Sequence, residues 1–232
     1  MSLVKKQGIL VSVLGALMMF AVALPAQAST ATPDKIAGNA TIKVIQLMKD
    51  NRAHYEKDPE AFYRDVEQVI TPVVAFDEIA RAVMGKYAHR VSDKEVDQFT
   101  QVFESTLVHF YSRAVLTFDA SQLSVSNVEP VPEELMKRYD AGRSRNVPVN
   151  LKVRSRDTEY TMSYSMMKQN GEWKVRNIVV EGINIGIQFR NQFENAVNRF
   201  RDVSKAIEKW PELMQQSEQE QVKELTDKNQ GE

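Results

Sequence analysis

The 232-residue sequence contains no cysteine, which excludes a disulfide framework and a lipid-modified N-terminal cysteine. Histidine is scarce: His54, His89 and His109 are the three in the sequence, and none has the spacing of a zinc motif such as HExxH. The sequence also lacks a GxSxG nucleophile motif, a P-loop and a GxGxxG dinucleotide motif. It therefore predicts no catalytic residue, no metal site, no cofactor and no enzymatic activity.

Long apolar runs are also scarce, because the sequence has one, near its N-terminus. Residues 9–24 are apolar or small, Lys5 and Lys6 precede them, and Ala26-Gln27-Ala28 follows as a small-x-small cleavage sequence. The run is shorter than the about 20 residues of a membrane-spanning helix. We therefore expect residues 1–28 to be a secretory signal peptide that is cleaved after Ala28. The mature chain is expected to work outside the cytoplasm without a membrane anchor.

An excess of charge of one sign is missing as well, because the formal net charge is −1. General nucleic-acid binders and proteins that bind anionic membranes carry a strong positive charge. The composition therefore argues against nucleic acid as a partner.

Helical periodicity is present in residues 29–118, where apolar residues recur at a spacing of about 3.6. Asp58, which precedes a proline, is predicted to be the N-cap of one helix, and Asp77 the N-cap of a shorter one. Ser92 and Glu95 form a capping box that opens the longest apolar stripe of the sequence. The N-terminal half is therefore predicted to be helical.

The period changes in residues 119–183, where apolar and polar residues alternate as they do in strands. Asn170-Gly171 is a strong signal for a tight hairpin turn between two of these strands. We expect an antiparallel sheet of four to five strands with one apolar face, which helices must cover.

A helical pattern returns in residues 184–210, which are predicted to form one long C-terminal helix. Residues 212–232 are rich in glutamate and glutamine, and we expect them to be a frayed helix followed by a disordered, polar acidic tail. The order of helices, sheet and helix predicts a single α+β domain over residues 29–211.

A second signal is a set of short motifs that lie in a fixed order along most of the mature chain. The stretch GEWKVRNIVVEGINIGIQFRNQF supplies Gly171, Trp173, Val175, Val180-Glu181-Gly182-Ile183 and Arg190-x-Gln192-Phe193. Upstream lie Phe76-Asp77, Gly85-Lys86-Tyr87, Phe99, Phe103 and Tyr111. Together they resemble the periplasmic phospholipid-binding component of the Mla intermembrane lipid transport system, also called the toluene-tolerance auxiliary family. The sequence departs from this family at Asn177, usually an aspartate, and at Phe189, usually a tyrosine.

The resemblance implies a fold similar to nuclear transport factor 2, in which helices wrap a curved antiparallel sheet and acyl chains insert between them. It implies a monomeric periplasmic carrier that shuttles diacyl phospholipids between the outer and inner membranes and maintains outer-membrane lipid asymmetry. The implied partners are an inner-membrane ABC transporter with an MCE-domain protein and an outer-membrane lipoprotein–porin complex.

Large apolar side chains of the predicted helices and strands are the candidates for a cavity wall that would bind lipid. They are Val73, Phe76, Val83, Met84, Tyr87, Phe99, Val102, Phe103, Leu107, Phe110, Tyr111, Val147, Val149, Leu151, Tyr160, Met162, Tyr164, Met166, Val175, Ile183, Phe189 and Phe193. Packing of these side chains against one another in a solid core is the alternative.

Basic residues are concentrated between positions 137 and 156, a segment that contains seven lysines and arginines and one acid, Asp140. The candidates for head-group or partner contact are Arg143, Arg145, Arg154 and Arg190. A solvated sheet edge is the alternative, and Arg190 also has Glu181 as a candidate ion-pair partner.

Two other functions stay open at this point. A small periplasmic hydrolase would use a histidine and carboxylates in the same pocket. The candidates are His109, which lies beside the apolar stripe of the longest helix, and the carboxylate pair Asp77 and Glu78. A histidine at the edge of the core, and acids at a helix start, are simpler explanations of these residues. The other alternative is an interaction or chaperone domain without a lipid cavity.

Overall fold

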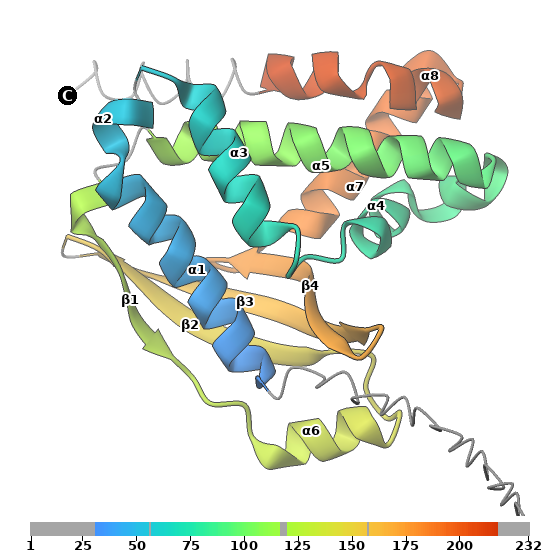
Figure 1. Cartoon of the computed structure of the whole chain (residues 1–232). Coiled ribbons are helices and arrows are strands. Elements are labelled where there is room, and N and C mark those ends of the chain that lie inside the picture. Colours follow the sequence, from blue (N-terminus) through green and yellow to red (C-terminus); the bar gives the residue numbers. More distant parts are fainter. Residues whose placement is uncertain (1–30, 56, 117–119, 157, 218–232) are drawn as a thin grey trace, which may run out of the picture.

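The computed structural model describes residues 31–217, apart from residues 56, 117–119 and 157. Its centre is a five-stranded sheet in which β1 (Leu123–Val128), β2 (Val147–Ser155), β3 (Thr158–Gln169), β4 (Glu172–Val180) and β5 (Ile183–Asn184) follow one another in order. Every neighbouring pair is antiparallel. The predicted α+β class, with a helical N-terminal half and an antiparallel sheet, is therefore confirmed (Figure 1).

The helices before the sheet are α1 (Pro33–Asp50), α2 (Arg52–Tyr55), α3 (Pro59–Ile70), α4 (Phe76–Met84) and α5 (Asp93–Leu116), with a 3₁₀ segment η1 (Gly85–Arg90) after α4. The predicted cap of α3 is confirmed, because the Asp58 side chain accepts a hydrogen bond from the Ala61 backbone N–H at 3.2 Å. The capping box of α5 is confirmed as well. The Glu95 N–H donates to Ser92 Oγ at 3.3 Å, and the Ser92 N–H donates to Glu95 Oε2 at 2.9 Å.

The predicted N-cap at Asp77 is wrong, because α4 starts at Phe76 and its N-cap is Ala75, two residues before the predicted cap. The backbone before α4 is held by the sheet: Val74 forms an isolated bridge with Val175, and the Ala75 N–H donates to the Val175 carbonyl at 2.9 Å. This pairing sets the start of the helix. The Asp77 side chain instead accepts a hydrogen bond from Gln169 Nε2 at 2.7 Å.

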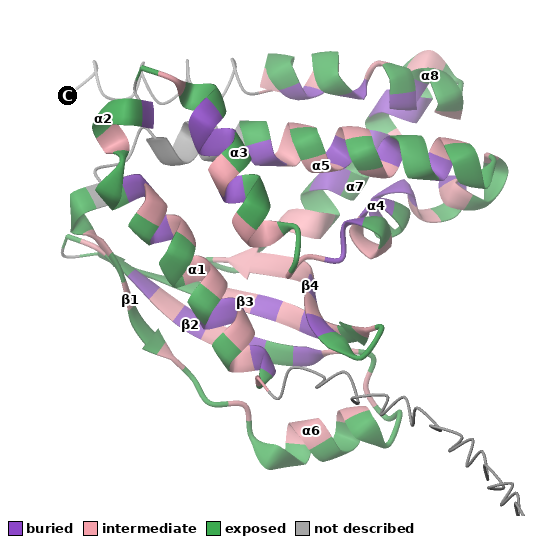
Figure 2. Cartoon of the chain, in the orientation of Figure 1, coloured by how far each residue is buried: buried purple, intermediate pink, exposed green. Residues whose placement is uncertain are grey.

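The hairpin between β3 and β4 turns at Asn170 and Gly171, whose φ angles are 52° and 84°. Asparagine and glycine adopt this left-handed conformation more readily than other residues, so the sequence signal is confirmed. Between β1 and β2 the chain forms a helix, α6 (Glu133–Asp140), that the alternating pattern did not predict. None of its residues is buried (Figure 2), although Met136 and Tyr139 pack against the core beside the sheet.

The predicted single C-terminal helix is corrected to two, α7 (Ile185–Phe200) and α8 (Val203–Glu208). Arg201 adopts a left-handed conformation that ends α7, and the Asp202 side chain caps α8 by accepting from the Lys205 N–H at 3.0 Å. Residues 210–217 are again helical, and Met214 is buried. The first part of the predicted polar tail is therefore a packed segment.

One face of the sheet is apolar and is covered by α1, which lies across the strands (Figure 1). Its buried residues alternate along β2, at Val147, Val149, Leu151 and Val153, as the period of two requires. On the other face, Glu159 pairs with Lys152 and Arg154 at 2.8 and 3.4 Å. These contacts, chiefly the hydrogen bond from Lys152, lower the pKa of Glu159 to about 2.

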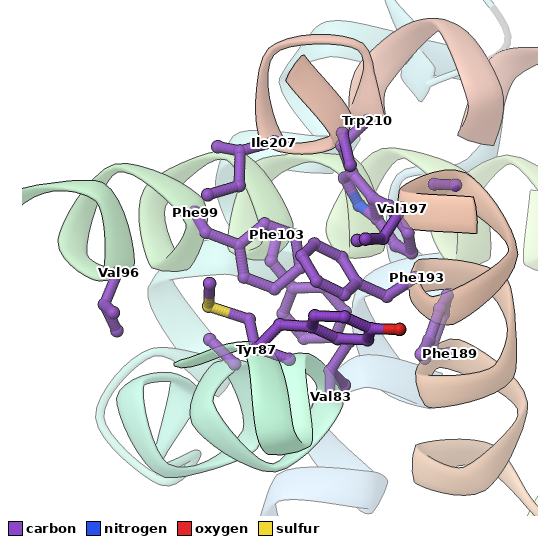
Figure 3. Close-up of a cluster of buried hydrophobic side chains, with 14 of the residues drawn as sticks. Val83, Tyr87, Val96, Phe99, Phe103, Phe189, Phe193, Val197, Ile207 and Trp210 are labelled. Atoms are coloured by element: carbon purple, nitrogen blue, oxygen red, sulfur yellow. The ribbon is translucent and has the colours of Figure 1, made fainter. Parts of the chain in front are cut away.

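A second core lies among α4, α5, α7, α8 and residue 210 onward (Figure 3). Phe99, Phe103, Phe193 and Trp210 are completely buried there, with ring centroids 4.8–6.3 Å apart in the closest pairs. Such pairs are worth about 0.5–1.5 kcal/mol beyond their area burial. Within the described ranges, no helix is both long enough and apolar enough to span a membrane.

Candidate functional site

An apolar cavity of about 330 Å³ lies between α1, the sheet, the C-terminal end of α3, the N-terminal ends of α4 and α7, and α5. Its α1 wall consists of Ala37, Ala40, Thr41, Val44, Ile45 and Met48. These positions recur every three or four residues, so the helical period places them all on one side of α1. The rest of the wall is Ile70, Val73, Val74, Phe76, Ile79, Leu107, Leu123, Val153, Met162, Tyr164, Val175, Asn177, Ile178, Ile185, Gly186 and Phe189.

The side-chain polar groups of this wall are paired with one another or with backbone. Thr41 Oγ1 donates to the Ala37 carbonyl at 2.8 Å, so at 2.9 Å it accepts from the Tyr164 hydroxyl. Burial raises the pKa of the Tyr164 phenol, which therefore stays neutral at physiological pH. Asn177 Oδ1 accepts from the Gly186 N–H at 3.1 Å. Such a wall can surround an apolar ligand, and its described residues present no charged group to it.

Some of the predicted wall residues come together at this cavity. They are Val73, Phe76, Leu107, Met162, Tyr164, Val175 and Phe189. Leu107 and Phe189 reach it from the helical side and Met162 and Tyr164 from β3, so the cavity lies at the junction of the sheet and the helices.

Other predicted wall residues lie away from the cavity, in one of the two cores. The helical core holds Val83, Met84, Tyr87, Phe99, Val102, Phe103 and Phe193. The core between α1 and the sheet holds Val147, Val149, Leu151 and Met166. Tyr160 and Ile183 are 37% and 51% exposed. Phe110 and Tyr111 fall outside the residues whose side chains are described.

The α1 wall was missed at the sequence level, although its apolar period was visible. Periodicity indicates that a helix has a buried side, but it does not indicate whether that side packs against other side chains or borders a cavity. Asn177 and Gly186 were also missed as wall residues. They are joined by a hydrogen bond from the Gly186 N–H to Asn177 Oδ1, which no local sequence pattern indicates.

A polar pocket of about 370 Å³ adjoins the cavity and shares Ile79, Asn177 and Gly186 with it. Three arginines line this pocket: Arg145, which precedes β2, Arg176 of β4 and Arg190 of α7. We call it the arginine pocket. Two of the four predicted head-group candidates, Arg145 and Arg190, therefore meet here, and Arg176 had not been predicted. Asn146, Ser165 and Asn184 add neutral polar groups.

The other two head-group candidates lie elsewhere. Arg143 is exposed outside the arginine pocket, and Arg154 pairs with Glu159 on the outer face of the sheet. Glu181, the suggested partner of Arg190, instead accepts a hydrogen bond from the Thr161 N–H. Arg190 contributes to the lowered pKa of Glu194, which is set mainly by the hydrogen bond from Lys86.

The residues of the catalytic alternative do not converge. His109 is exposed and packs against Tyr63, with ring centroids 4.3 Å apart and planes tilted by 52°. Neither Asp77 nor Glu78 lines the apolar cavity. Among the described residues, no three or more His, Asp or Glu side chains form a group that could hold a metal ion. The described geometry combines an apolar cavity with an adjoining pocket that three arginines line.

Comparison with known proteins identifies the family. The family model described as "MlaC protein" matches residues 39–212. The toluene tolerance protein ttg2D of Pseudomonas putida is 31% identical over 182 residues, which cover 77% of this chain and 80% of that protein. The fold is similar to that of a phospholipid-binding protein from Ralstonia solanacearum, solved in complex with a phospholipid. The TM-score is 0.68 and the identity 19%, over 80% of this chain and 98% of that one. Because the family model covers most of the sequence, this chain belongs to the MlaC family.

Proposed function

We propose that this protein is a periplasmic phospholipid carrier that holds acyl chains in the apolar cavity between α1 and the sheet. The observation that carries the proposal is the cavity itself, whose described wall has apolar side chains and internally paired polar groups. The name of the Ralstonia structure, a phospholipid-binding protein, supports the same class of ligand.

The energetics of a phospholipid explain why a carrier needs such a wall. Exposure of each methylene to water costs about 0.8 kcal/mol, so a lipid with two long chains leaves a bilayer very slowly unless a protein shields the chains. An apolar cavity replaces much of the lost burial and requires no bond to be made or broken. Its volume, about 330 Å³, falls within the range of about 300–1,000 Å³ that is usual for small-molecule pockets.

The proposal includes a route through the periplasm. Residues 1–28 are the export signal, and the mature protein carries phospholipid between the membranes as a monomer, which maintains outer-membrane asymmetry. It exchanges cargo with an inner-membrane ABC transporter that bears an MCE-domain protein, and with an outer-membrane lipoprotein–porin complex. The membership of the MlaC family supports this route.

Lipid analysis of the native protein tests the proposal. The full chain is expressed with its export signal, purified from the periplasm without detergent, and analysed by native mass spectrometry and by extraction into organic solvent. We expect a diacyl phospholipid in stoichiometric amount, on a protein that begins at Ser29. A protein recovered without bound lipid would contradict the carrier function.

A further inference from the structure

The arginine pocket opens beside the apolar cavity, so one amphipathic molecule can occupy both. Ile79, Asn177 and Gly186 line the two spaces in common. Asn177 of β4 and Gly186 of α7 are joined by a hydrogen bond of 3.1 Å, which holds the boundary between the two spaces in place. A ligand with its apolar part against α1 therefore places its polar part near Arg145, Arg176 and Arg190.

The charge of the arginine pocket is unbalanced. Its described lining includes no carboxylate, and neither Arg145 nor Arg176 has an ion-pair partner among the described residues. The nearby acid Glu194 is bound to Lys86 at 2.6 Å. Guanidinium groups that converge without a carboxylate repel one another, and an oxyanion that accepts their N–H groups relieves this repulsion.

The N-terminus of α7 adds to the positive potential. Asn184, Gly186 and Ile187, at the start of this 16-residue helix, line the arginine pocket. The N–H groups of Gly186 and Ile187 are already bound by Asn177 and Asn184. The helix therefore acts on a ligand through its dipole, which favours negative charge near its first turn.

The neutral lining distinguishes one class of head group from another. Asn146, Ser165 and Asn184 can exchange hydrogen bonds with hydroxyl groups. An ammonium or choline group would instead bring a further cation beside the three arginines, and the described lining holds no acid to pair with it.

We infer that Arg145, Arg176 and Arg190 bind the phosphate of the cargo and make the carrier selective for net-anionic, hydroxyl-bearing head groups over zwitterionic ones. This inference rests on the proposed function, because it assigns the polar end of the same ligand.

Competitive loading from vesicles tests the selectivity. The lipid-free full-length mature protein is incubated with vesicles of equal parts phosphatidylglycerol and phosphatidylcholine with identical acyl chains, then separated and analysed by mass spectrometry. We expect phosphatidylglycerol to be enriched at least about tenfold, which is about 1.4 kcal/mol, because both lipids carry the phosphate and only choline brings a further cation beside the arginines. The variants R145Q, R176Q and R190Q should each bring the ratio closer to that of the vesicles. R138Q, at an exposed arginine of α6, should retain the wild-type ratio.

The outcomes separate this inference from the carrier function. A protein that takes up neither lipid contradicts both. Uptake of both lipids in the vesicle ratio, or an enrichment that the three substitutions leave unchanged, overturns the inference while the carrier function stands. R145Q and R190Q alter exposed side chains, so they keep the test valid if R176Q folds poorly.

A second experiment titrates the lipid-free protein with inorganic phosphate. Binding that the substitutions abolish, without any change in lipid selectivity, would assign the pocket to a free anion and also overturn the inference.

Discussion

Ala40 is the residue at which the cavity can be filled with the least disturbance. It is a small, half-buried side chain in the middle of α1 and lines the cavity. We predict that Ala40→Trp lowers lipid occupancy severalfold in the native mass spectrum while the melting temperature is unchanged or raised, because the indole occupies existing space. Ala53→Trp makes the same change at an exposed position of α2 and should keep full occupancy. Equal occupancy in the two variants would place the acyl chains elsewhere.

The Thr41–Tyr164 hydrogen bond is the second prediction at the scale of residues. Thr41→Val leaves the buried Tyr164 hydroxyl without its partner and should cost about 1–3 kcal/mol, whereas Tyr164→Phe leaves Thr41 bonded to Ala37 and should cost about 0.5–1.5 kcal/mol. The double variant should be more stable than Thr41→Val alone, because no buried hydroxyl is then left unpaired. Urea unfolding of the lipid-free proteins measures these differences. Additive losses in the double variant would show that the two hydroxyl groups are not coupled.

At the scale of elements, Glu95 links the start of α5 to the start of α8. Its carboxylate accepts hydrogen bonds from the Ser204 hydroxyl and from the N–H and hydroxyl of Ser92. These bonds, that of Ser204 above all, lower the pKa of Glu95 from 4.5 to about 2. A carboxylate with a lowered pKa in the folded state stabilises the fold above the unfolded-state pKa. That stabilisation is lost as the pH falls toward the folded-state pKa.

We therefore predict that Glu95→Gln flattens the decline in stability between about pH 4.5 and pH 2, since glutamine does not titrate. Melting temperatures across this range, by circular dichroism, measure the slope for both proteins. Glu104→Gln, at another acid of α5 for which Thr71 is the hydrogen-bond donor, is the matched control for removal of one carboxylate from this helix. Identical slopes for wild type and Glu95→Gln would refute the link.

For the whole molecule, the division into a helical core and a cavity above the sheet separates stability from binding. Trp210 is completely buried in the helical core and is not part of the cavity wall. Trp210→Ala should lower the free energy of unfolding by about 3–5 kcal/mol, the usual cost of truncating a large core aromatic. Well below its melting temperature, the folded variant should still carry a full complement of lipid. Loss of lipid from the folded variant would show that the two regions are coupled, and Phe189, which belongs to both, is the residue through which we would expect it.

Local sequence patterns determined much of this fold. The caps at Asp58 and Ser92, the turn at Asn170 and the alternation along β2 depend on neighbours within a few residues, so they were predictable. Asp77 was misplaced as a cap because the start of α4 is set by a pairing between Val74 and Val175, which are far apart in the sequence. The break after α7 was missed for a related reason: Arg201 takes a left-handed conformation that lets α8 and Trp210 return to the helical core.

The site shows the same division more sharply. By itself the sequence determined the α+β class, the apolar faces and the family, because periodicity and short motifs can be read from the linear order of the residues. Only the tertiary structure decided which apolar faces leave a space: Val149 and Phe99 pack solidly, while Met162 and Ala40 line the cavity. It also brought Arg145, Arg176 and Arg190 together from three separate segments. A side chain that packs against its neighbours and one that borders a cavity have the same hydrophobicity. The volume left between them is a property of the packed chain, not of any one of its residues.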